Sequence, residues 1–189
     1  FFGIPLRTMP ANPTFDGSYV RLMNENDSPA HWFQLNQTGV PSSFINLNSF
    51  SGYEITQINP KTINFQGNLE NKDFESGQLS YTTGKSYPGQ HLIGNPYTAA
   101  IDISKIEFGS QDAGVIENSV YLYNTGSYDD WLAASPSNPS ADESSTAGQY
   151  IVIPKNVADR GLNIPSQILS MQAFLVRVKS NNTSAWIKI

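Results

Sequence analysis

The sequence predicts an all-β protein, a jelly-roll-like β-sandwich with almost no helix. Two observations lead to this prediction. Apolar and polar residues alternate over short segments, as in half-buried strands, and in Lys61–Gln66 the alternation puts Ile63 and Phe65 on one face. Turn residues such as Pro88-Gly89 and Asn181-Asn182 separate these segments at short intervals. Many short strands joined by such turns are typical of sandwiches and barrels.

Six segments fit the strand pattern, at residues 53–58, 61–66, 119–123, 150–153, 174–178 and 185–189. They are rich in Val, Ile, Tyr and Phe, which favour a pleated, half-buried surface. No window long enough for a stable helix shows the apolar spacing of an amphipathic helix. We expect at most one or two helical turns, near Asp129–Ala134 or Asn156–Arg160.

Composition and charge exclude several classes of protein. The chain has 189 residues, with 11 Lys and Arg against 16 Asp and Glu and a net charge of −5. Because binding to nucleic acid needs a basic face against phosphates, we expect no nucleic-acid partner. The absence of cysteine excludes disulfides and thiolate metal sites, and two histidines are too few for a His-rich site. No apolar run approaches the roughly 18 residues of a transmembrane helix, so no membrane insertion is expected.

Two parts of the sequence resemble each other. Three segments match in order and hydrophobic phase: Phe2–Leu6 with Ile93–Tyr97, Ser18–Asn24 with Ser119–Asn124, and Phe50–Ile55 with Met171–Val176. A tryptophan follows the second match in each part, Trp32 and Trp131. We interpret the pattern as a duplication with pseudo-repeats of about 1–88 and 89–189. If both repeats contribute strands to one sandwich, they share a core and residues 1–189 form a single domain, which we expect to be a fragment of a longer protein.

A family resemblance centres on Gly94-Asn95-Pro96-Tyr97 and the Ile101-Asp102 pair that follows it. These residues resemble the G-N-P-[YF] signature of β-sandwich modules in secreted and cell-surface proteins of Bacteroidetes. The segments Gly52–Gly67 and Ile164–Val176 resemble two further parts of the same family. Such modules often lie upstream of the C-terminal sorting domains of type IX secretion.

The resemblance implies a secreted or cell-surface location and a non-catalytic structural or adhesion role. The expected partners are other domains of the same polypeptide, and a host or matrix protein or a glycan. No cofactor is implied. The alternative function is that of a carbohydrate-binding module attached to a polysaccharide-acting protein.

The Gly94-Asn95-Pro96 motif also has a physical interpretation as a structural corner. Glycine adopts backbone conformations closed to other residues, and we expect Gly94 to do so. Asn95 precedes a proline and is therefore pushed toward an extended conformation. Its side-chain amide can hydrogen-bond nearby backbone and fix the end of a strand. We therefore expect the motif to serve folding and not binding.

The candidate ligand-binding residues are Tyr128, Asp129, Asp130 and Trp131. Aromatic rings beside carboxylates suit stacking on a sugar face with hydrogen bonds from its hydroxyls. Two alternatives stay open. The aspartates could ligate calcium or form a solvated turn, with no metal site as the expectation, and Trp131 could pack over a sheet as the counterpart of Trp32.

The segment 133–148 contains no large apolar residue and is expected to form a protruding surface loop. A search for catalytic motifs finds no nucleophile elbow, phosphate-binding loop or zinc-binding helix motif. His31 and His91 have no sequence context that predicts a catalytic base. The sequence therefore favours a protein without enzymatic activity.

Overall fold

The fold was determined as a computed structural model, which describes residues 1–28, 30–36, 46–57, 60–110, 114–124, 149–158, 165–180 and 184–189. The candidate residues Tyr128 to Trp131 and the segment 133–148 lie outside the described residues. The described part is built from short strands, as predicted, with two single turns of 3-10 helix. The all-β fold is confirmed.

Five strands belong to the first repeat: β1 (Thr8–Pro10), β2 (Ser18–Met23), β3 (Trp32–Gln34), β4 (Asn46–Asn48) and β5 (Tyr53–Gln57). Eight belong to the second: β6 (Gln90–Gly94), β7 (Ile101–Asp102), β8 (Glu107–Gly109), β9 (Ser119–Asn124), β10 (Gln149–Pro154), β11 (Gln167–Ile168), β12 (Ala173–Arg177) and β13 (Trp186–Lys188). The 3-10 turns are η2 (Ile103–Lys105) and η3 (Lys155–Val157), and η3 overlaps one of the two places where a helical turn is expected.

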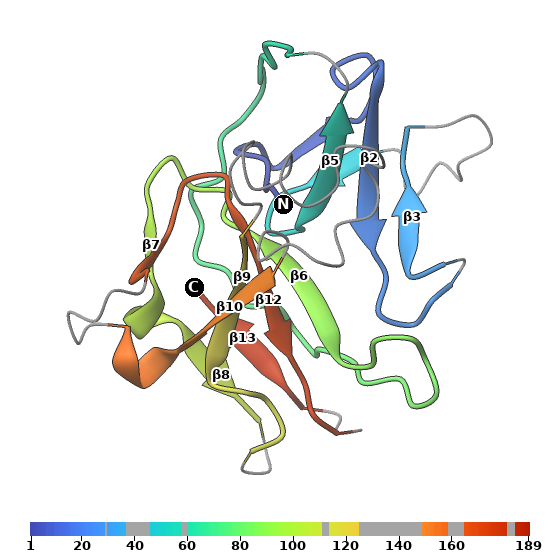
Figure 1. Cartoon of the computed structure of the whole chain (residues 1–189). Coiled ribbons are helices and arrows are strands. Elements are labelled where there is room, and N and C mark those ends of the chain that lie inside the picture. Colours follow the sequence, from blue (N-terminus) through green and yellow to red (C-terminus); the bar gives the residue numbers. More distant parts are fainter. Residues whose placement is uncertain are drawn as a thin grey trace, which may run out of the picture.

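Two antiparallel sheets carry most of the structure (Figure 1). One has the strand order β3-β2-β5, and the other has the order β10-β9-β12-β6. Three smaller antiparallel pairs, β1-β4, β7-β11 and β8-β13, complete the fold. The central strands are rich in β-branched and aromatic residues, and four of the five residues of β12 are buried.

The two large sheets are related by the duplication. In the first repeat Phe2 pairs with Tyr53, and in the second Ile93 pairs with Phe174. Each sheet therefore has the same four-element order, with the segment around Phe2 taking the place of β6. The small pairs β1-β4 and β7-β11 are also equivalent, since Leu47 and Ile168 lie at corresponding positions and both are fully buried.

The junction between the repeats is reciprocal. The Gly3 N–H donates to the Met171 carbonyl at 2.8 Å, and the Gly94 N–H donates to the Phe50 carbonyl at 3.0 Å. Phe50 and Met171 are equivalent positions, and both have a left-handed backbone, with φ of 63° and 60°. Each bond in one direction thus has a counterpart in the other, which is the arrangement produced by a local pseudo-two-fold axis.

The buried side chains divide by repeat and do not form one shared core. One cluster runs from Ile4 to Tyr53, and a larger one contains residues from Leu79 to Ile187. A third, smaller cluster joins them, with Leu92, Ala173 and Leu175 against Phe1, Met23, Trp32 and Tyr121. The expectation of a common core is therefore corrected, because only this junction cluster combines both repeats.

The boundary between the repeats also differs from residue 88. The segment from Phe74 to Leu79 runs beside the C-terminal strand β13, with backbone bonds between Phe74 and Ile189 in both directions. Phe74, Leu79 and Tyr81 pack in the second cluster. By packing, the second repeat therefore begins before residue 74.

Two sequence expectations about local structure are wrong. Residues Lys61–Gln66 form no strand, although Ile63 and Phe65 face the first cluster as their alternation predicts. The alternation indicates only that one face of the segment packs on a core, whereas a strand also needs a backbone partner.

The second error concerns Trp32, which pairs with Met23 while Tyr150 pairs with Tyr123. Val20 and Val120 are equivalent and fully buried, so the counterpart of Trp32 is Tyr150 and not Trp131.

Candidate functional site

Asn95 in the Gly-Asn-Pro motif is fully buried, and its side chain is satisfied by backbone groups. The amide nitrogen Nδ2 lies within hydrogen-bond distance of three carbonyls, at 3.0 Å from Ala99, 3.2 Å from Ile168 and 3.0 Å from Leu169. Its Oδ1 accepts the Tyr97 N–H at 2.9 Å. These contacts join the end of β6 to β11, as a structural corner requires. The purely structural role stays a prediction.

Gly94 needs to be glycine for a different reason from the one expected. Its backbone does not lie in the left-handed region. A side chain there would place its Cβ 2.6 Å from the Ser51 carbonyl oxygen and 2.7 Å from the Cα of Gly3. The two glycines allow the chains of the two repeats to approach closely, and this close approach is the physical reason for glycine at both positions.

The structure brings together a second set of residues, which we call the aromatic groove. It consists of two adjoining hollows that share Trp32 and Tyr150. The first, of about 370 Å³, is lined by Phe1, Arg21, Trp32, Glu54, Ile55, Thr56, Tyr123 and Tyr150. The second, of about 300 Å³, is lined by Met23, His31, Trp32, Tyr87, Gln90 and Tyr150.

Aromatic rings from both repeats contact one another in the groove. The ring of Phe1 lies 5.7 Å from Trp32, 4.9 Å from Tyr123 and 6.2 Å from Tyr150. Tyr123 and Tyr150 meet edge to face at 5.3 Å. Tyr150 is 41% exposed and Tyr87 is 52% exposed, so rings of this cluster face solvent as well as each other. Burial, with the neighbouring Tyr123, Glu54 and Tyr87, raises the pKa of Tyr150 to about 12. Its phenol therefore keeps its proton at neutral pH.

A charge pair lies in the wall of the first hollow. The Nη2 atom of Arg21 lies 2.6 Å from both carboxylate oxygens of Glu54. The same guanidinium lies 5.6 Å from the centre of the Trp32 ring, in cation-π contact. The two residues face each other across paired strands β2 and β5. Their opposite charges cancel, while both keep polar atoms at the surface.

The turn between β2 and β3 is held against residues 80–89 by two carboxylates. Glu25 is 6% exposed and accepts four hydrogen bonds: from Ser80 Oγ, Thr82 Oγ1, Thr82 N–H and Gly89 N–H. Burial acts to raise the pKa of Glu25, but these bonds outweigh it and lower the pKa to about 2. Asp27 accepts from the N–H and the hydroxyl of Ser86, at 2.9 and 3.0 Å.

This clamp positions one side of the groove. Tyr87 follows Ser86 directly, and its ring lies 4.7 Å from the ring of His31. His31 Nδ1 lies 3.4 Å from Asp27 Oδ1. The carboxylates of the turn thus hold the segment that carries Tyr87, and His31 lies beside both Asp27 and the Tyr87 ring. No local sequence signal marks Glu25 and Asp27, because their hydrogen-bond donors lie more than fifty residues away in the chain.

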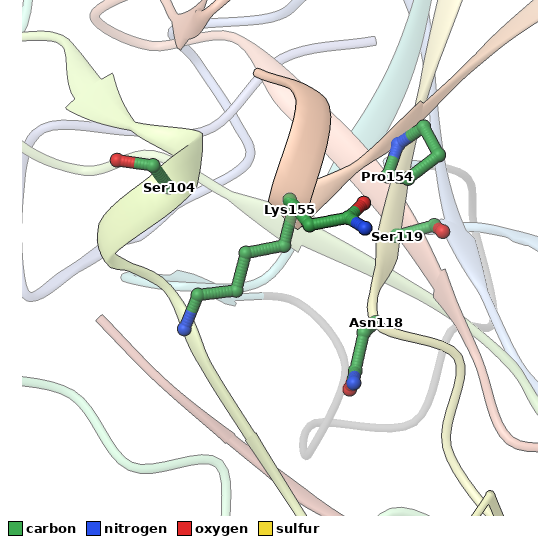
Figure 2. A pocket seen from close by; sticks show the side chains of 6 residues that line it. Ser104, Asn118, Ser119, Pro154 and Lys155 are labelled. Carbon is green, nitrogen blue, oxygen red and sulfur yellow. The ribbon is translucent and has the colours of Figure 1, made fainter. Parts of the chain in front are cut away.

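A larger hollow, of about 570 Å³, lies elsewhere in the second repeat (Figure 2). It is lined by Ser104, Asn118, Ser119, Pro154, Lys155 and Asn156. Among the described residues, its lining carries no aromatic ring, carboxylate or histidine. Side chains of this kind supply neither a stacking platform nor an acid-base pair.

The described residues contain no group of three or more side chains that could hold a metal ion. Burial lowers the pKa of His91, whose Nε2 lies 2.8 Å from the Ser80 carbonyl oxygen. The ring is therefore held by backbone and not by a carboxylate, as a catalytic triad would require. Within the described part, no helix is long and apolar enough to cross a membrane.

Comparison with known proteins gives one informative match. The chain is 40% identical over 148 residues to the "Minor fimbrium subunit Mfa5" of Porphyromonas gingivalis. The alignment covers 76% of this chain and 11% of that protein, so the chain spans about a tenth of the relative it matches. No family model matches the chain. No solved structure shows a significant match.

Proposed function

We propose that this chain is a non-catalytic structural or adhesion module of a bacterial cell-surface fimbrial protein. The observation that carries the proposal is the 40% identity to a fimbrium subunit over three quarters of the chain. Identity at this level over 148 residues makes a common fold the expected outcome. The match supports a location at the cell surface, in agreement with the expectation from the sequence.

The extent of the match is consistent with a module in a longer polypeptide. The chain corresponds to about a tenth of its relative, so most of that protein lies outside the matched segment. The partners we propose are other domains of the same polypeptide and other protein subunits of the surface structure. Secretion by the type IX route, with a sorting domain downstream, belongs to the same proposal and rests on the resemblance of the Gly94-Asn95-Pro96 motif.

The alternative, a carbohydrate-binding module attached to a polysaccharide-acting protein, receives no support from the comparison, which names a fimbrium subunit. Among the described residues, the three hollows above have no pair of carboxylates in their lining, so they lack the arrangement needed for glycoside hydrolysis; this concerns catalysis and not sugar binding.

Immunogold labelling of intact cells tests the proposal. Antibodies against residues 1–189 should label the surface of cells that carry the full-length parent protein, and the antigen should co-purify with filaments sheared from those cells. Cells with an in-frame deletion of these residues are the control for antibody specificity. Antigen found only in the cytoplasmic fraction would contradict the proposal.

A further inference from the structure

We propose that the aromatic groove binds an uncharged saccharide chain. This inference concerns a site of the chain itself and does not depend on the fimbrial role proposed above. It names other residues than Tyr128 to Trp131, which lie outside the described residues. The rings, the polar walls and the charge balance of the groove support this assignment.

The rings supply the surface on which a sugar can stack. Trp32 and Tyr150 line both hollows, while Tyr123 lies in the first and Tyr87 in the second. Tyr and Trp combine an apolar face with a polar edge, so they can contact the C–H face of a pyranose and still bond its hydroxyls. Because the two hollows share two rings, neighbouring sugar units of one chain can occupy them together.

The walls supply planar polar groups that can donate hydrogen bonds and others that can accept them. In the first hollow, the Arg21 guanidinium donates and the Glu54 carboxylate accepts. In the second, the Gln90 amide and the His31 ring can each donate and accept. A sugar hydroxyl both donates and accepts, so it can satisfy neighbouring members of these pairs at the same time. A few placed polar groups among aromatic side chains are typical of small-ligand sites, and both volumes fall at the lower end of the range for such sites.

The charge balance favours an uncharged ligand. Arg21 and Glu54, whose charged side chains line the first hollow, neutralise each other at 2.6 Å. An acidic or basic ligand would therefore find no uncompensated side-chain charge of opposite sign in this pair. A proline-rich peptide would contact the rings well, but it offers mainly carbonyl acceptors. It would offer no hydroxyl donor to the Gln90 side-chain oxygen, which a hydroxyl-rich chain does.

The groove is held in shape before any ligand binds. Arg21 is paired with Glu54 and stacked on Trp32, and the Glu25 and Asp27 carboxylates hold the segment that carries Tyr87. Side chains already fixed by packing and hydrogen bonds lose little further conformational freedom on binding. This low entropic cost allows a site made of only a few rings to bind its ligand with measurable affinity.

Affinity electrophoresis of the 189-residue chain in native gels tests the proposal. The gels contain one neutral polysaccharide each: mixed-linkage β-glucan, xylan, galactomannan or soluble starch. The net charge of −5 gives the protein its own mobility. We expect at least one polysaccharide to retard the wild-type chain, and Trp32→Ala, Tyr87→Ala and Tyr150→Ala to weaken that retardation by about tenfold.

The choice of variants separates binding from folding. Trp32 packs in the junction cluster, whereas Tyr87 and Tyr150 are 52% and 41% exposed, so the tyrosine variants should retain the melting temperature. Leu169→Ala removes an apolar side chain that is 62% exposed and lines neither hollow, and it should bind like the wild type. Absence of retardation by all four polysaccharides would overturn the proposal. Binding of a polyproline peptide in their place, or unchanged binding by both tyrosine variants, would overturn it as well.

Discussion

The buried carboxylate of Glu25 gives a prediction about stability that can be worked out from its contacts. It accepts two backbone N–H groups, from Thr82 at 2.6 Å and from Gly89 at 2.9 Å, and two hydroxyls at 2.7 and 2.8 Å. Replacement by alanine leaves both backbone donors without this acceptor. An unsatisfied buried donor costs about 1–3 kcal/mol. We expect Glu25→Ala to lower the free energy of unfolding by about 3 kcal/mol, which corresponds to a fall in Tm of about 6–12 °C.

The variant Glu25→Gln separates the contribution of the carboxylate charge to stability from that of the hydrogen bonds themselves. A glutamine keeps one acceptor oxygen for the backbone donors, and the two hydroxyls can rotate to accept from its amide. The remaining cost is the loss of charge-assisted bonding, about 2–3 kcal/mol at neutral pH. The wild-type pKa falls from 4.5 to about 2 on folding, so the charge stabilises the fold above pH 4.5 and this contribution disappears as the pH falls from 4.5 to 2. The loss at pH 3 is about 2 kcal/mol.

Urea unfolding at a series of pH values between 7 and 3 measures this effect. The difference in unfolding free energy between the wild type and Glu25→Gln should shrink by about 2 kcal/mol from pH 6 to pH 3. Asp27, Glu70 and Asp102 also have lowered pKa values, but they are present in both proteins and cancel in the difference. Glu75→Gln, at an exposed carboxylate, should keep the wild-type pH profile. A constant difference between the wild type and Glu25→Gln would refute the assignment.

Three further predictions concern the junction and the segment outside the described residues. Gly94→Val should lower the unfolding free energy by about 2–4 kcal/mol in a denaturant titration, because its Cβ would meet Ser51 and Gly3. The control Gly77→Ala has open space around its Cβ and should cost only about 1 kcal/mol. Equal costs for the two variants would contradict the close approach of the chains at Gly94. A chain divided near Pro88 should leave residues 1–88 unfolded, since the cut removes the junction residues Leu92, Ala173 and Leu175 that pack against Phe1, Met23 and Trp32. Cooperative melting of that fragment would count against one domain. Limited proteolysis should cut first within residues 133–148, and initial cleavage elsewhere would disagree with a protruding loop.

The sequence predicted the features that depend on local pattern. The predicted strand at residues 174–178 overlaps β12 (Ala173–Arg177), and the one at 119–123 lies within β9 (Ser119–Asn124). The matches of Phe2–Leu6 and Phe50–Ile55 to the second half correspond to real structural equivalence, because their counterparts exchange reciprocal hydrogen bonds at the junction. Such features can be recognised from the sequence alone, since a strand and a repeated segment each have a characteristic pattern within a few residues.

Features that depend on distant contacts were not predicted. Lys61–Gln66 has the same alternation as β12 but no backbone partner, and nothing in the segment itself distinguishes the two cases. The exposed aromatic groove combines residues from β2, β3, β5, β9 and β10, so its rings are scattered over the sequence. Sequence proximity directed attention to Tyr128 and Trp131, whereas Tyr150 reaches the groove through its register with Tyr123.

The position of the groove follows from the duplication. Residues related by a two-fold axis lie close to each other only near that axis. Trp32 and Tyr150 occupy equivalent positions in the two sheets, and both lie against the ring of Phe1 and line the same two hollows. The groove therefore lies where the repeats meet, and one repeat alone would supply only half of its rings. A binding surface of this kind arises from the pairing of two repeats, because each repeat buries its own cluster and leaves one aromatic position open at the shared edge.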